Sequence, residues 1–347
     1  MQPDDYQTAD AFFRKVASYF AAAHAQRGEN RPALIVFPED FATFLLLEGR
    51  RAFIDRAQTL DEAFRAMALH DWRRLLATLW RYRTLKTRAA FFTALAPRVW
   101  EVWRHTMTTL AKEYGMTVVA GTALLPDFAA ETKGGPFRPV DARVYNVSFT
   151  VNPEGQVISV TRKVNLVPTQ EDVLQLTPGP LEQALAWSYL PGTRIKLATA
   201  ICYDGFCCPH TPREPHFTNV LARLDDAGVQ VVAQPSANPW RWDEPWPFDD
   251  ARERPARTRA QQWYEEGAFA SLTQCRAVEV VVNPQLIMEF LDLHFDGQSA
   301  IFARDGQAVA PLALSRATRG PEADEVLHAV WRPRDPAAAN ARGESKT

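Results

Sequence analysis

The sequence predicts an α/β fold, because segments with helical spacing of apolar residues are followed directly by short apolar strands. Residues 9–26 repeat large apolar side chains at helical spacing, and residues 33–37 then form a continuous apolar strand. A helix that Pro97 restarts and that ends at Gly115 precedes a strand at 117–121. A helix near 258–278 precedes a strand at 280–282. This alternation is typical of α/β proteins.

Length, charge and cysteine usage exclude several classes of protein. The chain has 347 residues, enough for one large or two ordinary domains, and a formal net charge of −2, which predicts no general affinity for nucleic acid. The acidic N-terminus does not resemble a secretory signal, and no apolar run is long enough to span a membrane. The four cysteines, three of them within 202–208, do not form a disulfide framework. We therefore expect a cytoplasmic protein without stable membrane insertion.

The remaining elements follow in order along the chain. Residues 55–95 carry Arg, Leu, Trp and Phe at three- and four-residue spacing, which predicts helices. From residue 143 the period changes to two, which predicts a hairpin of 143–151 and 157–164 around an Asn-Pro-Glu-Gly turn. Later predicted elements are a strand at 198–201, a helix around 216–227, a strand at 229–234, and β-like segments at 299–302 and 326–331. Residues 333–347 are rich in Pro, Ala and Gly, and we expect a disordered tail there.

Three polar side chains stand at the ends of predicted strands. Cys202 ends an apolar run immediately before a Tyr-Asp-Gly turn, Glu39 follows the strand at 33–37, and Lys163 lies near the end of the hairpin. Each has an ordinary interpretation alone: a helix N-terminal carboxylate, a solvated lysine and a small core thiol. Because α/β proteins place their chemistry at the carboxyl ends of strands, the three together predict a catalytic site.

The order of short motifs resembles the nitrilase superfamily of carbon-nitrogen hydrolases, in its amidase-like branch. The matching residues are Phe37-Pro38-Glu39, Gly121-Thr122-Ala123, Tyr145-Asn146, Arg162-Lys163 with Glu171, Ile201-Cys202-Tyr203-Asp204, Pro235-Ser236-Ala237, Arg276-Ala277-Val278-Glu279 and Phe295-Asp296-Gly297-Gln298-Ser299. The resemblance implies an αββα sandwich of two β-sheets flanked by helices. It implies a single domain over 8–332 with a helical insertion at about 48–96, and a homodimer or higher homo-oligomer.

The chemistry of a carbon-nitrogen hydrolase requires these residue types. An amide carbon is a poor electrophile, so a thiolate from Cys202 is the expected nucleophile, and Lys163 nearby would favour the thiolate. Glu39 can take the thiol proton and return it to the leaving amine. The Lys163 ammonium and the backbone N–H of Tyr203 would hold the oxyanion. The resemblance implies that Glu171 positions the substrate and the lysine.

Several alternatives remain at this point. The same acyl-cysteine could pass its acyl group to an amine, and nitrile hydrolysis is less expected because nitrilases proper resemble Cys-Trp-Glu after the nucleophile. A structural zinc site at Cys207-Cys208-Pro209-His210 with His216 is disfavoured because adjacent cysteines lack the usual ligand spacing, and we expect no metal or cofactor. The segment Gly297-Gln298-Ser299-Ala300-Ile301 begins like a serine-hydrolase elbow but lacks the closing glycine, so we interpret it as the start of a late strand.

Two departures from the family pattern also bear on function. Relatives usually open with a strand, whereas a helix begins here by about residue 9, so either the true start lies upstream or the sheet tolerates the loss. Residues 71–90 hold six basic side chains against one acid, Asp71. That region could be a helical lid or subunit contact with a solvated basic face, a pocket wall for a bulky or anionic acyl group, or a peripheral membrane contact.

Overall fold

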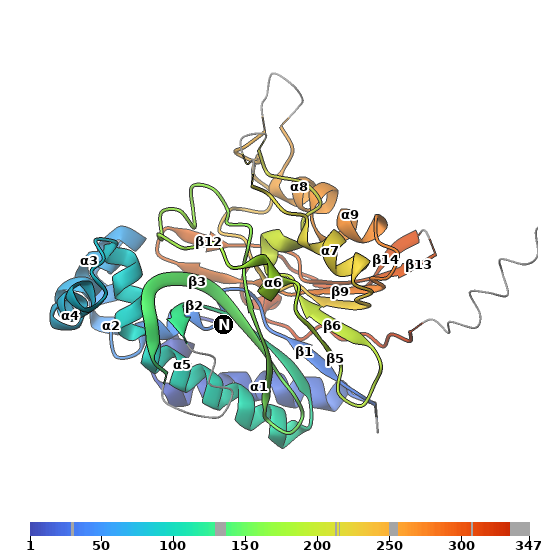
Figure 1. Cartoon of the computed structure of the whole chain (residues 1–347), viewed down its shortest axis with the longest axis horizontal. Helices are drawn as coiled ribbons and strands as arrows, with labels where there is room; N and C mark the ends of the chain where they lie inside the picture. The colour runs from blue at the N-terminus through green and yellow to red at the C-terminus, as the bar shows by residue number, and fades with distance from the viewer. Residues whose placement is uncertain are drawn as a thin grey trace, which may run out of the picture.

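Two β-sheets pack face to face between two layers of helices (Figure 1). The computed structural model describes residues 1–28, 31–128, 137–211, 214, 216–249, 256–306 and 308–333. The tail expected at 333–347 lies outside the described residues from residue 334 onward. The predicted α/β class and the sandwich of two sheets are confirmed.

The first sheet has four strands in the order β1-β2-β3-β4. Its strands are β1 (Leu34–Val36), β2 (Thr117–Phe128), β3 (Pro139–Val151) and β4 (Val157–Arg162). β1 pairs with β2 in parallel, with Ile35 opposite Val118, and the other two pairings are antiparallel. β3 and β4 form the predicted hairpin. The described residues ahead of α1 (Ala9–Gln26) hold a short 3-10 helix, η1 (Pro3–Tyr6), and no strand.

The second sheet has six strands in the order β14-β13-β9-β7-β6-β5. Its strands are β5 (Trp187–Tyr189), β6 (Lys196–Thr199), β7 (Val231–Ala233), β9 (Val280–Asn283), β13 (Ala300–Asp305) and β14 (Ala308–Leu314). β6, β7 and β9 are mutually parallel at its centre. Two short pairs lie outside the main sheets: β8 (Ser236–Ala237) with β10 (Gln285–Leu286), and β11 (Met288–Phe290) with β12 (Leu293–Phe295).

Alternation along the strands builds three apolar layers. On β7, Val231 packs between the two sheets against Val119 of β2, whereas Val232 points into the layer under the helices. The outer helices of that second layer are α7 (Val220–Asp226), α8 (Arg259–Glu266) and α9 (Ala268–Thr273). On the other side, α1 and α5 (Thr87–Tyr114) cover the first sheet through a large core that includes Phe20 and Trp103.

Several expected elements differ from the structure. Pro97 does not restart a helix but lies inside the 28-residue helix α5, most of which is buried. The helix expected near 258–278 is two helices that meet at Gly267, where a Cβ would lie 2.5 Å from the Trp263 carbonyl oxygen. The β-like segment 326–331 is not a strand; β13 pairs with β9 on one side and on the other with β14, a strand that the sequence did not predict.

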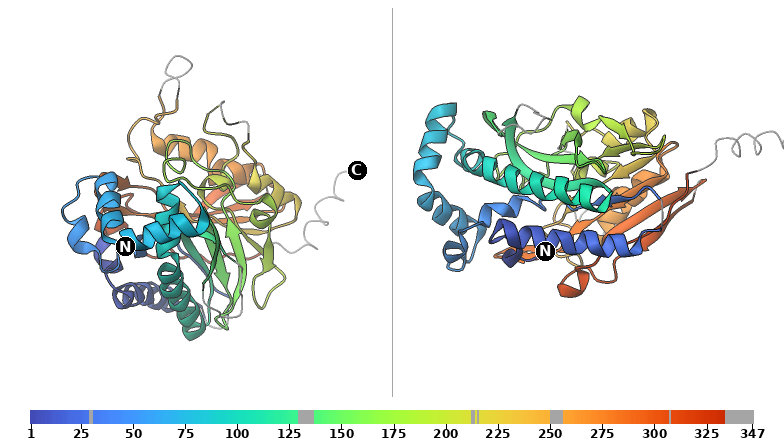
Figure 2. Two further views of the ribbon diagram at one scale, coloured as in Figure 1. Left: turned by 60° about the vertical axis from the view of Figure 1, so that its left-hand side comes forward. Right: turned by 90° about the horizontal axis from the view of Figure 1, so that it is seen from below.

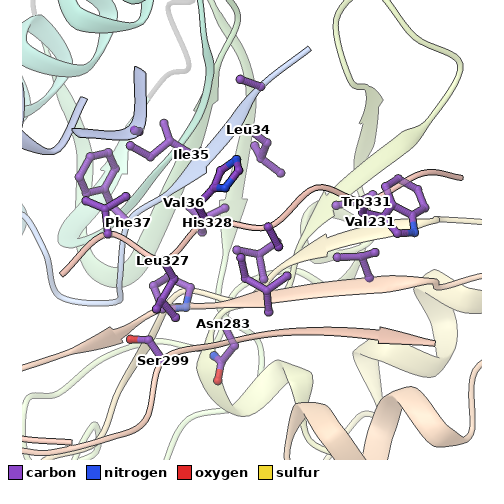
Figure 3. A pocket seen from close by; sticks show the side chains of 18 of the residues that line it. Leu34, Ile35, Val36, Phe37, Val231, Asn283, Ser299, Leu327, His328 and Trp331 are labelled. Carbon is purple, nitrogen blue, oxygen red and sulfur yellow. The ribbon is translucent and has the colours of Figure 1, made fainter. Parts of the chain in front are cut away.

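A cavity of about 860 Å³ opens at the free edge of β1 (Figure 3). It is lined by β1, by the second sheet at Val231 and Asn283, and by the extended C-terminal segment at Leu327, His328 and Trp331. The segment 326–331 therefore lines a cavity instead of forming a strand. None of the predicted catalytic residues is among the residues that line it.

The expected insertion is helical. It holds α2 (Arg51–Ile54), α3 (Leu60–His70), α4 (Trp72–Tyr82) and the first turns of α5. α3 and α4 stand at one end of the molecule, beside the sandwich (Figure 2). Arg88, in the first turn of α5, donates through Nη1 to the Val173 carbonyl oxygen at 2.7 Å, so the insertion also contacts the loop that follows β4.

Candidate active site

Glu39 lies in the loop that leaves β1, where it is almost completely buried. This loop crosses β2 at Gly121, whose φ of +72° is in the left-handed region. A Cβ at Gly121 would lie 2.4 Å from the Pro38 carbonyl oxygen, so glycine is required for the close approach. Glycine at 121 thus lets the chain bring Glu39 down between the two sheets.

Lys163 follows the last residue of β4, and its ammonium is bonded to two carboxylates. Its Nζ donates to Oε1 of Glu39 at 2.8 Å and to Oε2 of Glu171 at 2.8 Å. The Lys163 backbone N–H donates to the Asn146 carbonyl oxygen at 3.0 Å, which extends the β3–β4 ladder by one residue. The lysine is therefore fixed both by its backbone and by two ion pairs.

Both carboxylates have further donors. Nδ2 of Asn146 lies 2.8 Å from Oε1 of Glu39 and 3.3 Å from Oε1 of Glu171. The backbone N–H of Ala237 donates to Oε2 of Glu39 at 3.0 Å, and that of Val167 donates to Oε2 of Glu171 at 2.7 Å. Charge-assisted bonds of this kind fix the orientation of an ionised carboxylate.

Cys202 is the first residue of the 3-10 helix η3 (Cys202–Gly205), which follows the strand β6 after a short connection. Its φ of +47° is a left-handed value that a side chain rarely adopts. The backbone is held by the Cys202 N–H donating to the Pro235 carbonyl oxygen at 2.8 Å and by Nε2 of Gln234 donating to the Cys202 carbonyl oxygen at 2.8 Å. Sγ lies 3.8 Å from the Ala237 carbonyl oxygen. Strain of this kind is common where a nucleophile must be presented at a turn.

Ala237 links Cys202 to Glu39. Its backbone N–H contacts the Glu39 carboxylate and its carbonyl oxygen faces the Cys202 thiol. The backbone N–H of Tyr203 donates to no acceptor within the described residues. The structure thus brings Glu39, Lys163, Glu171 and Cys202 into one buried cluster, with an unused backbone donor beside the thiol.

The electrostatics of the cluster keep the thiol protonated. Burial, followed by the charge of Glu39, raises the pKa of Cys202, and the opposing effect of Lys163 is smaller. Lys163 thus favours the thiolate in the expected direction, but burial and the charge of Glu39 outweigh it. Burial also raises the pKa of Glu39. For Lys163, burial favours the neutral amine, but Glu171 and Glu39 outweigh it and hold the pKa of the ammonium well above its usual value.

Three residues that position the cluster were not predicted from the sequence as site residues. Asn146 bridges the two carboxylates, and Gln234 anchors the carbonyl group of Cys202. Asp204 is fully buried and accepts from the backbone N–H groups of Val164, at 3.1 Å, and Asn165, at 2.8 Å, so it ties the turn at Cys202 to the segment after Lys163. The only signal for Asn146 and Asp204 was their place in the motifs.

A buried cation lies beside the cluster. The Arg259 guanidinium donates through Nε to Oδ1 of Asn238 at 2.7 Å and packs against tryptophan rings, its Cζ lying 3.9 Å from the centre of the Trp246 ring and 4.8 Å from that of Trp263. Ring faces stabilise a cation that is removed from water. Within the described residues no carboxylate forms an ion pair with Arg259.

Comparisons with known proteins show the family and the fold of the chain. The family model described as carbon-nitrogen hydrolase matches residues 1–320. Among solved structures, a cysteine-to-serine variant of the Nesterenkonia AN1 amidase from the nitrilase superfamily is 14% identical, with a TM-score of 0.53 over 90% of this chain and 83% of that chain. The cysteine-to-alanine variant of the same amidase is 15% identical, with a TM-score of 0.53 over 90% of this chain and 82% of that chain. No curated protein matches the sequence.

A family match over this length identifies the class of protein. The chain belongs to the carbon-nitrogen hydrolase family, as the order of its motifs predicted. It is an enzyme that acts on carbon–nitrogen bonds, and its fold is that of the nitrilase-superfamily amidases. None of the helices in the described part of the chain is both long and apolar enough to cross a membrane. The segment at 297–301 leads into β13, so it starts a strand as expected.

Proposed function

We propose that the protein hydrolyses an amide through a thioester on Cys202. The observation that carries the proposal is the buried contact of Lys163 with both Glu39 and Glu171, beside a thiol that faces Ala237. A solved double variant of the Nesterenkonia amidase, with a TM-score of 0.52 and 14% identity to this chain, is described in complex with acrylamide, which supports an amide as the substrate class.

In the first half of the reaction, Glu39 takes the proton of the Cys202 thiol as sulfur attacks the amide carbon. The carbonyl π electrons move onto oxygen, and the oxyanion is held by the Lys163 ammonium and the Tyr203 N–H. Glu39 then gives its proton to the leaving nitrogen, and the carbon–nitrogen bond breaks. Because the pKa of Glu39 is raised, it is a better proton acceptor than an exposed glutamate, and it can still return the proton.

In the second half, Glu39 takes a proton from water, and the resulting hydroxide attacks the thioester carbon. The tetrahedral intermediate collapses, the carbon–sulfur bond breaks, and the thiolate regains the proton from Glu39. Glu171 holds the ammonium in place through its 2.8 Å contact and does not exchange protons with the substrate. The products are a carboxylic acid and an amine or ammonia.

Two further proposals accompany this function. We propose that the enzyme works in the cytoplasm, since its four cysteines form no disulfide within the described residues and the nucleophile needs a reduced thiol. We also propose a homo-oligomer, as the family resemblance implies. Light scattering of the purified protein measures its mass directly, and a monomer at working concentration would contradict the second proposal.

Ammonia release from a panel of amides, ureas and nitriles tests the proposed function. Wild type should release ammonia from at least one amide, and Cys202→Ala should lower turnover by at least ~10²-fold. Cys275→Ala, which changes a buried cysteine of the second core layer, is the matched control and should retain activity. Turnover that survives in Cys202→Ala would refute the thioester. Hydroxylamine distinguishes acyl transfer, because a hydroxamate that outpaces acid formation would favour an amine acceptor over water.

A further inference from the structure

The helical insertion exposes an apolar face that the proposed reaction does not use. Trp72, Leu76 and Trp80 recur at four-residue spacing along α4, and such residues lie on one face of a helix. Their exposed fractions are 49%, 55% and 85%, and Leu85, just beyond the helix, is 96% exposed. We name Trp72, Leu76 and Trp80 the α4 face. Soluble monomers rarely expose so many neighbouring large apolar side chains without a binding role.

Exposed arginines lie beside and beyond the α4 face. On a helix of 3.6 residues per turn, Arg73 lies about 20° from Trp80 in projection, whereas Arg81 lies about 100° beyond Trp80 and about 180° from Trp72. The guanidinium of Arg73 sits 5.3 Å from the centre of the Trp72 ring. Within the described residues neither Arg73 nor Arg81 has an ion-pair partner, although Arg74 lies 3.6 Å from Asp71. The arginines are thus available to an anionic partner.

The opposite side of α4 packs against the rest of the protein. Leu75 packs against the core of the first helical layer, and Thr78 is buried. The helix also ends on a hydrogen bond from the Tyr82 hydroxyl to the Pro139 carbonyl oxygen at 3.2 Å, at the start of β3. α4 is therefore fixed on the sandwich, and its apolar face cannot turn inward without breaking these contacts. Figure 2 shows α3 and α4 at one end of the molecule, where a flat surface can approach them.

We propose that the α4 face binds the surface of an anionic lipid bilayer. Tryptophan and leucine side chains enter the interfacial layer, Arg73 contacts lipid phosphates at the same depth, and Arg81 adds electrostatic attraction from further out. The charges favour an anionic surface over a second copy, because residues 71–90 hold six basic side chains against one acid and a two-fold contact would place two such basic regions against each other. The chain lies on the membrane and does not cross it. The enzyme would then meet its substrate at a membrane surface.

Vesicle sedimentation of the full-length protein tests this proposal independently of catalysis. The protein should bind phosphatidylcholine vesicles that contain phosphatidylglycerol, and it should bind pure phosphatidylcholine vesicles at least about tenfold more weakly. Arg73→Gln with Arg81→Gln should lower the affinity for anionic vesicles about 30-fold, which corresponds to about 1 kcal/mol per arginine. Trp72→Ala with Trp80→Ala should weaken binding to both kinds of vesicle.

Matched controls use residues of the same type on other surfaces. Trp187→Ala changes a half-exposed tryptophan on β5, and Arg14→Gln changes an exposed arginine on α1; both should bind like wild type. All of these side chains are partly or largely exposed, and circular dichroism confirms that each variant is folded. Equal binding of wild type to neutral and anionic vesicles, or no binding to either, would overturn the proposal. A wild-type oligomer that dissociates in the tryptophan variant would instead make the α4 face a subunit interface, and would also overturn it.

Discussion

Removing the Lys163 ammonium should destabilise the protein as well as inactivate it. In Lys163→Met the side chain keeps much of its length but loses the charge, and two buried carboxylates, Glu39 and Glu171, remain without a cation. Breaking a buried ion pair by removing one partner costs about 3–5 kcal/mol. For a chain of this size that corresponds to a fall in Tm of roughly 4–7 °C.

The loss of folding stability in Lys163→Met should depend on pH. Without the ammonium, the pKa of the carboxyl pair in the folded protein lies above its value in the unfolded chain. Stability from such a group is present below the unfolded pKa and is lost as pH rises through the folded pKa. The loss of unfolding free energy relative to wild type should therefore be larger at pH 8 than at pH 5, where the carboxyl pair can hold a proton.

A double-variant cycle gives the sharpest measurement. Adding Glu171→Gln to Lys163→Met removes one of the two unpaired charges, so it should restore part of the free energy of unfolding, measured by urea titration at both pH values. Lys112→Met changes an exposed lysine of α5 and should stay within about 0.5 kcal/mol of wild type. A stability of Lys163→Met within about 1 kcal/mol of wild type, or no recovery on adding Glu171→Gln, would refute the reasoning.

Three further outcomes follow from the geometry. Gly121→Ala should lower both Tm and turnover, because its Cβ would press on the Pro38 carbonyl oxygen next to Glu39. The control Gly192→Ala has a φ of +76° and no atom within 4 Å of a Cβ, so it should cost only about 1–2 kcal/mol of stability and leave turnover intact. Equal losses in the two variants would contradict this reasoning. A hydrogen bond from Cys208 lowers the pKa of Cys207 to about 7, so N-ethylmaleimide should modify Cys207 with a midpoint near neutral pH and long before the buried Cys275, as peptide mass spectrometry would show; preferential labelling of Cys275 would count against it. Arg88→Gln should lower kcat/KM about fivefold by releasing the loop that carries Glu171, with Arg83→Gln as the control, and identical kinetics in the two variants would exclude that connection.

The strand-end positions of Glu39 and Cys202 could be read from the sequence because apolar runs and turn residues mark where a buried strand stops. The partners that hold these side chains could not. Asn146 lies within a strand, and its role depends on Nδ2 reaching two carboxylates that are 107 and 25 residues away in the chain. Contacts of that kind arise only once the hairpin packs against the loop after β1.

Packing also explains the elements that differ from the sequence prediction. Pro97 is tolerated inside α5 because this helix is buried along most of its length, and tertiary contacts outweigh the local preference for a helix start. The strand β14 was not predicted because its residues are mostly exposed and include Pro311, a residue type that is found on edge strands. It is indeed the edge of the six-stranded sheet. Segment 326–331 has strand-like composition, yet it pairs with neither sheet.

Because the backbone at Cys202 is left-handed, the residue that the proposed reaction needs at this position is not the one that gives the highest stability. Glycine adopts a φ of +47° without steric penalty, so Cys202→Gly should unfold at a higher denaturant concentration than Cys202→Ala, although both lack the thiol. Natural selection for turnover would keep the residue with the more strained backbone at this turn. A mutational library screened for thermal resistance alone should therefore lose Cys202, and one screened for catalysis should retain it, because Cys202 is the proposed nucleophile.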